Sequence, residues 1–347
     1  MVKVTLNRTR VNKFKRHAVA SVPRCNQLQP FEERIARKII SKPPDDYRAG
    51  MRYTSHMQLL WLFLTLLCAF SLATSDALTK KALAARHNEY LIAWLRLLIM
   101  LPFLVLLLSL FPLPRLGPEF VHTIILALPL ELLALILYFK ALKLSPLGLS
   151  VPFLALTPVF LIVIPNLLLR ERISLTGGAG ICLIAVGSYA LNLHNQGTGF
   201  LAPFRSIFRE PGSLCMIGVA VIYSFTATLG KQAISSSSPL FFAGLYPILL
   251  FLFLTPLALW KGRHELKHPG LFRATLLPAL FSLMETISGV IALSLTNVAY
   301  MIAVKRLSLL IGIVYGHFLF GEHGLRERLM GGVLMVAGVA LIMLGGG

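Results

Sequence analysis

Two glutamates interrupt apolar stretches that are otherwise long enough to cross a lipid bilayer. Glu131 lies in the middle of LPLELLALI, and Glu285 lies in the middle of SLMETISGV. A charged side chain at the centre of a bilayer costs roughly 2.5–3.5 kcal/mol on insertion scales, so such residues usually have a functional role. A carboxylate in this position can bind a proton or a cation. The alternative is that each glutamate only hydrogen-bonds between helices or reaches water on a tilted helix.

Further charged residues lie inside the apolar runs. Arg96 lies about two turns into the second run, and Lys305 and Arg306 lie about two turns into the ninth. These cations could pair with one of the glutamates or with an anionic substrate. The alternatives are ion pairs between helices and side chains that reach the membrane surface. Asp76 follows a polar stretch near the end of the first run, where it could line an entrance or simply be solvated.

The sequence has no motif for hydrolytic, metal or cofactor chemistry. It contains no HExxH, no GxSxG and no paired acidic metal motif. Its four cysteines form neither a CxxC pair nor a zinc-ligand spacing. We therefore expect no enzyme, no catalytic residue, no cofactor and no metal ion. A membrane-embedded enzyme acting on lipids stays open as an alternative, and it would need a nucleophile or a metal constellation near a membrane surface.

The composition excludes a soluble globular protein and a disordered chain. Of the 347 residues 56% are hydrophobic and only 14% are charged, with a mean hydropathy of +0.76. The unbroken apolar runs have helical rather than strand length, which also opposes an outer-membrane barrel. Because backbone polar groups in hydrocarbon must bond within their own segment, we predict an all-α integral membrane protein with ten transmembrane helices. The runs are 58–79, 89–111, 120–138, 147–168, 175–193, 212–230, 239–260, 272–293, 298–320 and 328–345.

The second half of the apolar region repeats the first. A shift of 151 residues aligns Lys80 with Lys231 without a gap, and it also aligns rarer residue types. Among these are the pairs Glu171/Glu322, Gly180/Gly331 and Gly187/Gly338. Five helices per half is an odd number, so the second copy must enter the membrane from the opposite side, which predicts inverted five-helix repeats. The same shift brings Glu131 onto Ser282, about one turn from Glu285, so we expect both carboxylates to face one cavity.

Short polar motifs recur in the same order in both halves. The first half contains Ser71-Leu-Ala-Thr-Ser-Asp-Ala-Leu-Thr-Lys-Lys-Ala, Arg96, Leu156-Thr-Pro-Val and Leu169-Arg-Glu-Arg. The second contains Tyr223-Ser-Phe-Thr-Ala-Thr-Leu-Gly-Lys-Gln-Ala, Val298-Ala-Tyr-Met-Ile-Ala-Val-Lys-Arg-Leu-Ser and Phe318-Leu-Phe-Gly-Glu. On these motifs each half resembles the EamA domain of the drug/metabolite transporter superfamily, over about residues 58–345. The resemblance implies ten helices and the export or exchange of small metabolites, without naming a substrate. One departure is that Tyr246-Pro247 stands where the first half has Leu95-Arg96.

A basic segment precedes the repeats. Residues 1–56 hold 13 of the 33 Lys and Arg and 4 of the 14 Asp and Glu. This segment is either a disordered cytoplasmic tail or an over-long gene start, with translation beginning at Met51 or Met57. Because the other basic residues lie mostly in loops, we expect no nucleic-acid partner. The predicted parts of the chain are 1–57, the first repeat 58–193, the linker 194–211 and the second repeat 212–345.

Assembly and orientation follow less directly. The repeated glycines predict close packing of the last helix of each half, and the resemblance leaves a homodimer through these helices open. An N-terminus on the cytoplasmic side rests on the resemblance alone. It places Lys231 inside and Lys80 outside, and it leaves more basic loop residues outside than inside, contrary to the positive-inside rule.

The leading hypothesis is a secondary transporter in a bacterial inner membrane. It would export a small polar or amphipathic metabolite by alternating access, with proton coupling through Glu131 or Glu285. The expected partners are that small molecule and the lipid bilayer. A structural or regulatory membrane protein without transport activity is the alternative from another class.

Overall fold

The computed structural model describes residues 47–84, 87–111, 113–145, 151–193, 211–262, 266, 270–321 and 325–345. The chain divides into two units, Met1–Asp46 and Tyr47–Gly347. The first unit lies outside the described residues, and so do the linker residues 194–210. The predictions made for the basic tail and the linker therefore fall almost wholly outside the part that the structure describes.

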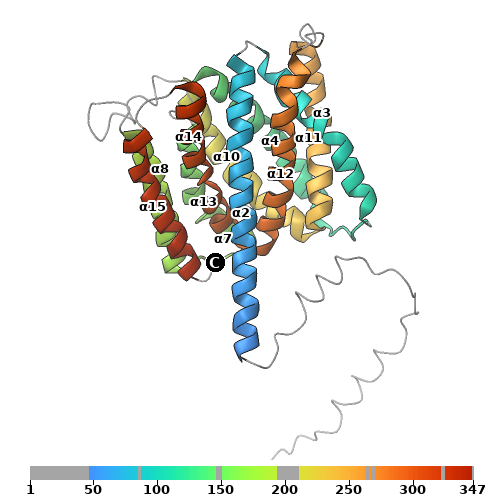
Figure 1. The fold of residues 1–347 in the computed structure, drawn as a ribbon. Coiled ribbons are helices and arrows are strands. Elements are labelled where there is room, and N and C mark those ends of the chain that lie inside the picture. Colours follow the sequence, from blue (N-terminus) through green and yellow to red (C-terminus); the bar gives the residue numbers. More distant parts are fainter. Residues whose placement is uncertain are drawn as a thin grey trace, which may run out of the picture. The chain divides into compact units, whose positions relative to one another are not determined.

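All regular structure in the described residues is helical (Figure 1). The first repeat contains α2 (Tyr47–Ala84), α3 (Glu89–Leu110), α4 (Glu119–Leu144), η1 (Val151–Leu156), α6 (Thr157–Phe160), α7 (Ile164–Leu169) and α8 (Leu175–Leu193). The second contains α10 (Pro211–Ser235), α11 (Pro239–Gly262), α12 (Leu271–Leu295), α13 (Val298–Lys305), α14 (Ser308–Phe320) and α15 (Leu325–Leu344).

Seven described helical segments are long and apolar enough to cross a membrane, so the predicted count of ten is not confirmed. The remaining three predicted runs form shorter apolar helices, at Thr157–Leu169, Leu175–Ala190 and Gly331–Leu344. The fourth run is broken into η1, α6 and α7, because prolines remove backbone donors and clash with the preceding turn.

The ninth run breaks at the position equivalent to a break in the fourth. η1 ends at Leu156 and α6 follows it, while Leu307 separates α13 from α14, 151 residues later. Pro158 accounts for the first break, whereas the sequence around Leu307 contains no proline. The second break follows Lys305 and contains Arg306, two of the predicted site residues.

Each major helix packs against a helix of the other repeat. The pairs are α2 with α12, α4 with α10, α3 with α11, and α8 with α15. The 151-residue shift converts the first pair into the second and each of the other two pairs into itself. Figure 1 shows α8 beside α15 at one side of the Tyr47–Gly347 unit and α3 beside α11 at the other. The two repeats are thus related as the two halves of a pseudo-twofold arrangement.

Contacts between helix ends show that equivalent helices run in opposite directions. The Lys80 ammonium group donates to the carbonyl of Ser145 at 2.6 Å, so α2 and α4 end together. The Gly117 N–H, just before α4, donates to the Ser236 carbonyl at 2.8 Å, just after α10. α10 therefore runs antiparallel to α4 and to its own counterpart α2. Likewise Asn88, at the start of α3, donates to the Lys261 carbonyl near the end of α11 at 3.2 Å.

Lys80 and Lys231 have equivalent structural roles, which corrects their assignment to loops. Lys80 lies in α2 and also donates to the Leu142 carbonyl at 3.3 Å. Lys231 lies in α10 and donates to the carbonyls of Leu293 and Thr296 at 2.5 and 2.7 Å. Each lysine thus satisfies the last carbonyls of the third helix in its own repeat. Neither charge belongs in a count of loop charges.

The glycines of the fifth and tenth helices allow α8 and α15 to touch along their backbones. A Cβ atom at Gly180 would lie 2.6 Å from the Gly338 carbonyl oxygen, and one at Gly187 would lie 2.6 Å from the Gly331 carbonyl oxygen. The close packing predicted from these glycines is confirmed within one chain. The homodimer stays a prediction.

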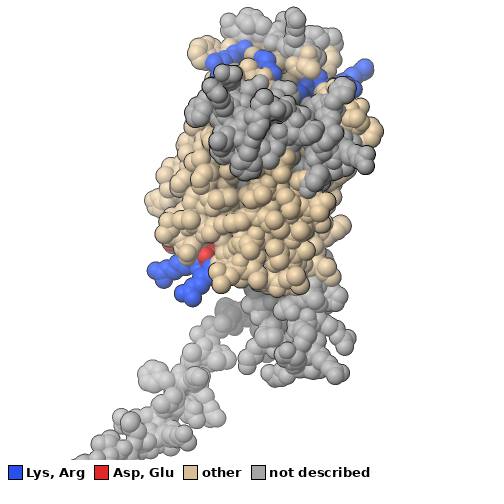
Figure 2. All heavy atoms as spheres, turned by 90° about the vertical axis from the view of Figure 1, so that its left-hand side faces the viewer, with Lys and Arg blue, Asp and Glu red and all other residues tan. Residues whose placement is uncertain are grey.

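The outer surface of the Tyr47–Gly347 unit is largely apolar. Figure 2 shows Lys and Arg near both ends of the face that it draws, with an uncharged belt between them. Large side chains such as Phe63, Ile125, Phe253 and Val333 are more than half exposed. A soluble protein rarely exposes so much apolar surface, whereas lipid tails cover it at little cost.

Candidate functional site

One cavity of about 280 Å³ lies between the two repeats. It is lined by residues of α2, α3, α4, α10, α11, α12 and α13, together with Leu154 of η1 and Thr157 of α6. All six residues predicted for the substrate or ion pathway line it: Asp76, Arg96, Glu131, Glu285, Lys305 and Arg306. The structure therefore brings together charges from positions more than two hundred residues apart. Their role in binding stays a prediction.

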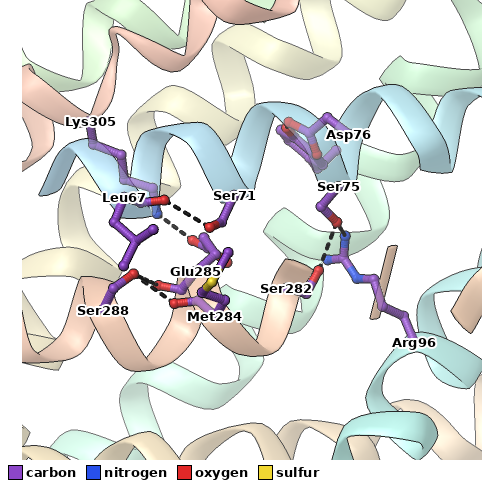
Figure 3. A network of polar contacts seen from close by, with 11 residues as sticks. Leu67, Ser71, Ser75, Asp76, Arg96, Ser282, Met284, Glu285, Ser288 and Lys305 are labelled. Atoms are coloured by element: carbon purple, nitrogen blue, oxygen red, sulfur yellow. Dashed lines mark hydrogen bonds and ion pairs between the residues drawn. The ribbon is translucent and has the colours of Figure 1, made fainter. Parts of the chain in front are cut away.

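Lys305 and Glu285 form an ion pair on one wall of the cavity (Figure 3). Lys305 Nζ lies 2.6 Å from Glu285 Oε1, and the two side chains are 19% and 22% exposed. Glu285 lies in the middle of α12, and Lys305 is the last residue of α13, just before the helix break. The break thus places the ammonium group opposite the carboxylate.

Asp76 is buried and not solvated, which corrects one interpretation of its position. Its side chain in α2 is 6% exposed and accepts a hydrogen bond from the Tyr138 hydroxyl group in α4. Among the described residues its second oxygen, Oδ1, has no hydrogen-bond partner. A carboxylate oxygen without a partner in such a place is costly unless a proton or a ligand compensates it.

Arg96 reaches the same cavity from α3. Its Nη1 lies 3.4 Å from Ser75 Oγ, and its guanidinium carbon lies 4.7 Å from the centre of the Phe139 ring. Ser75 in turn lies 2.8 Å from Ser282 Oγ of α12 (Figure 3). Arg96 is therefore held by a ring face and a hydroxyl group, and it does not extend to the membrane surface.

Glu131 and Ser282 occupy equivalent positions and meet equivalent partners. The Thr226 hydroxyl group lies close enough to hydrogen-bond with Glu131, as Ser75 does with Ser282. Thr226 and Ser75 are themselves 151 residues apart. The same contact therefore joins α4 to α10 and α2 to α12. Of the two equivalent positions, only Glu131 carries a carboxylate, whereas Ser282 carries a hydroxyl group.

No uncharged residue of the cavity was predicted from the sequence as a site residue, although Tyr246 stood at the departure from the repeat. Tyr138, Tyr223 and Tyr246 line the cavity, and the Tyr138 and Tyr223 ring centres are 6.4 Å apart. A usable signal was present, because Tyr138 lies two helical turns after Glu131 and so shares its helix face. Aromatic residues are common in apolar runs, so these tyrosines do not stand out from the sequence as the charged residues do.

A polar cluster joins the two repeats at the start of α13. The Glu171 carboxylate accepts from the Val298 N–H at 3.0 Å, at the start of α13, where Asn297 makes no side-chain cap. The Tyr300 hydroxyl group accepts from the Ser174 N–H at 3.0 Å. Glu171 thus caps a helix of the other repeat, which specifies its predicted role at a helix end. Its counterpart Glu322 lies outside the described residues.

Removal of this cap should loosen the contact between the repeats. We expect Glu171→Ala to lower the free energy of unfolding by about 1 kcal/mol, because the Val298 N–H and the α13 dipole lose their carboxylate partner. Reversible unfolding in mixed detergent micelles measures this change. Arg172→Gln is the matched control, because that side chain is exposed. Equal effects of the two substitutions would contradict the capping role.

Chemically, the cavity offers three carboxylates, three cations and several hydroxyl groups. Such a set can bind a small polar molecule or a proton at the centre of an apolar protein. None of the described lining residues is His or Cys.

The comparisons with known proteins agree with the two-repeat architecture. The sequence pattern of the EamA-like transporter family matches residues 59–193 and again residues 210–344. A solved structure titled "Crystal structure of protein" is similar over 84% of this chain and 97% of its own, with a TM-score of 0.59 and 17% identity. At that identity the likeness shows the fold alone. No curated protein matches the chain. The two matches to one family pattern cover most of the chain, which therefore belongs to the EamA-like transporter family and is a multi-pass integral membrane protein.

Proposed function

We propose that this protein is a secondary transporter that exports a small metabolite across a bacterial inner membrane by alternating access. The observation that carries the proposal is the charged cavity between two oppositely directed repeats. Charges inside a membrane protein are costly and mark ion or substrate pathways. Transporters with inverted repeats bind their substrate at the junction of the repeats and expose it by moving one repeat against the other.

The full arrangement that we propose is ten membrane-crossing segments in two inverted sets of five. The broken fourth run would cross as η1, α6 and α7 together, and α8 and α15 would cross as a pair. Broken helices at the centre of a transporter are tolerated where they line a cavity. Leu154, Thr157, Met301 and Lys305 lie near the two breaks and line the cavity, which supports this arrangement.

Two other functions fit less well. A structural or regulatory role would leave the buried charges unexplained, and it predicts that Glu131→Leu and Glu285→Leu have no phenotype. A lipid-modifying enzyme would need a reactive group near a membrane surface. The six charged residues that line the cavity instead converge in the interior, which favours transport.

Proton coupling through Glu131 or Glu285 is the prediction that tests this function. We expect Glu131→Gln and Glu285→Gln each to lower substrate efflux roughly tenfold, because a neutral amide replaces a charge-assisted partner and cannot carry a proton. Metabolite profiles of the medium from overexpressing and deletion cells identify the substrate. Efflux of that substrate from reconstituted vesicles then measures the effect and its pH dependence.

Glu119→Gln is the control for this experiment. Glu119 starts the same helix as Glu131, is exposed, and accepts from Gln232 at 2.7 Å, a bond that a glutamine oxygen can retain. Undiminished, pH-dependent efflux in both cavity variants would refute proton coupling through these residues. Medium of unchanged composition in overexpressing and deletion cells would contradict export itself.

A further inference from the structure

We propose that Arg96 and Arg306 together bind the oxyanion group of a small amphipathic organic anion. This inference names the substrate class of the cavity and rests on the transport function proposed above. It follows from a difference between the three cations of the cavity. Lys305 is paired with a carboxylate, whereas Arg96 and Arg306 have side-chain nitrogens without a hydrogen-bond partner among the described residues.

Arg306 is the most deeply buried cation of the site. Its side chain is 4% exposed, at the break between α13 and α14. Among the described residues its guanidinium group makes no hydrogen bond and no ion pair, and its buried Nε has no partner. A buried charge is stable only when it is paired and hydrogen-bonded. The donors of Arg306 are therefore available to a ligand in the cavity.

Arg96 is also only partly satisfied. Among the described residues it makes a single hydrogen bond, to Ser75, which is long at 3.4 Å, and its buried Nε has no partner there. The guanidinium group lies over the Phe139 ring. Stacking of this kind fixes the plane of the group and leaves its N–H donors at the edge free for a carboxylate or a phosphate.

The two guanidinium groups act on the same part of the cavity. Both are close enough to Tyr138, Tyr223 and Asp76 to interact with them electrostatically. Both arginines line the same cavity, so an oxyanion there could accept from donors that come from α3 and from the α13–α14 break.

The remaining charges of the cavity have partners, although Asp76 keeps one oxygen without one. Lys305 is paired with Glu285 at 2.6 Å. Asp76 accepts from Tyr138, and Glu131 lies against Thr226. The described part of the chain shows no ion pair between these carboxylates and either arginine. Among the charged side chains of the site, the buried atoms without a partner are thus Nε of both arginines and one oxygen of Asp76, and this excess of unfilled donors favours an anion over a cation.

The rest of the lining suits an apolar body attached to that anion. Tyr223, Phe242 and Tyr246 present aromatic rings, and Leu97 and Leu250 add aliphatic surface. A volume of about 280 Å³ accommodates one ring-sized molecule. Aromatic walls with a few fixed polar groups are typical of sites that orient a small ligand.

Binding of matched probes to the purified full chain tests the proposal. Phenylacetate and phenyl phosphate carry the anion, phenylacetamide is neutral, and phenethylamine is cationic, all on a similar body. Equilibrium dialysis of radiolabelled phenylacetate in detergent, with competition by the other probes, gives the affinities at one pH. We expect both anions to bind at least tenfold more tightly than the amide and the amine. The stronger of the two anions distinguishes a carboxylate from a phosphate substrate.

Variants assign the binding to the two arginines. Arg96→Gln and Arg306→Gln should each weaken phenylacetate binding roughly ten- to a hundredfold, the value of a hydrogen bond to a charged group. Arg96→Lys and Arg306→Lys keep the charge, lose the two-pronged geometry and should give intermediate losses. Arg115→Gln, at an exposed arginine between α3 and α4, should have no effect. Thermal unfolding of each variant without probe shows that it is folded, and the Lys variants serve where a Gln variant is not.

The outcomes separate this inference from the proposed function. Equal binding of the amide or the amine, no binding of either anion, or full anion binding in the arginine variants would overturn the anion site. Arginine-dependent binding without any flux of phenylacetate or of the exported metabolite in vesicles would support the site and contradict transport. Flux of a metabolite that carries no anionic group would keep transport and overturn the anion site.

Discussion

Lys305→Ala is expected to lower the free energy of unfolding by about 3 kcal/mol. The substitution leaves the Glu285 carboxylate in the interior without the ammonium group that lies 2.6 Å from it. Breaking a buried pair by removing one partner is strongly destabilising, because the uncompensated charge keeps its desolvation cost. Removing both charges in Lys305→Ala/Glu285→Gln should cost only about 1 kcal/mol, since neither partner then remains as an uncompensated charge. Unfolding in mixed detergent micelles measures all four members of this cycle.

A second ion pair of the same length provides the control. Lys143 Nζ lies 2.6 Å from Glu89 Oε2, but the Lys143 side chain is 39% exposed near the end of α4. Water screens such a pair, so Lys143→Ala should cost less than about 1 kcal/mol. Equal costs for the two lysine substitutions would show that the cavity is as well solvated as the surface. That result would also weaken the case for a binding site in the interior of the protein.

The sequence was most informative where charge and apolar context conflict. Glu131, Glu285 and Lys305 stood out because a bilayer tolerates few charges, and the structure places all three around one cavity. The 151-residue repeat predicted the equivalent helix pairs, because residues such as Gly180 and Gly331 are uncommon enough to align. It also predicted that Glu131 and Glu285 would face one cavity, because Glu131 aligns with Ser282, which lies about one helical turn from Glu285.

The sequence was least informative where a side chain could bond to distant backbone. Lys80 and Lys231 read as loop charges, yet each caps a helix that ends more than sixty residues later. For Asp76 the polar neighbours left a solvated position open beside a place at an entrance, whereas the structure buries its side chain against Tyr138. Hydropathy predicts whether a single segment is apolar. The contacts of Lys80, Lys231 and Asp76 depend instead on which helices pack together in the fold.

The repeat also explains why the site itself was harder to predict than the fold. Structural residues obey the 151-residue shift, since both halves must pack the same helices. The charged residues of the cavity do not follow this shift, because Arg96 aligns with Pro247 and Arg306 aligns with Ala155. One polar substrate needs one set of partners, so the cavity must be asymmetric. Such an asymmetric site is expected at positions where the two halves differ in residue type. Tyr246-Pro247, which aligns with Leu95-Arg96, is one of these positions.

Gly187→Ala is expected to lower the free energy of unfolding by about 2 kcal/mol. The added Cβ would lie 2.6 Å from the Gly331 carbonyl oxygen and 2.9 Å from the Met335 nitrogen, so the backbones of α8 and α15 must move apart. Overpacking of a rigid contact costs about 1–3 kcal/mol, and membrane helices depend on close approach for their association. Because Gly180 meets Gly338 in the equivalent way, Gly180→Ala should have a similar cost.

Gly178→Ala should have the opposite sign, although it lies in the same helix. Its Cβ would meet only Ile173 at 3.9 Å, an ordinary contact. Alanine then stabilises the helix by roughly 0.5–1 kcal/mol, since glycine loses more backbone entropy on folding. Unfolding of the three variants in the same detergent mixture measures both effects. Equal effects at Gly187 and Gly178 would mean that helix propensity, and not the contact between the two repeats, determines the stability of this helix pair.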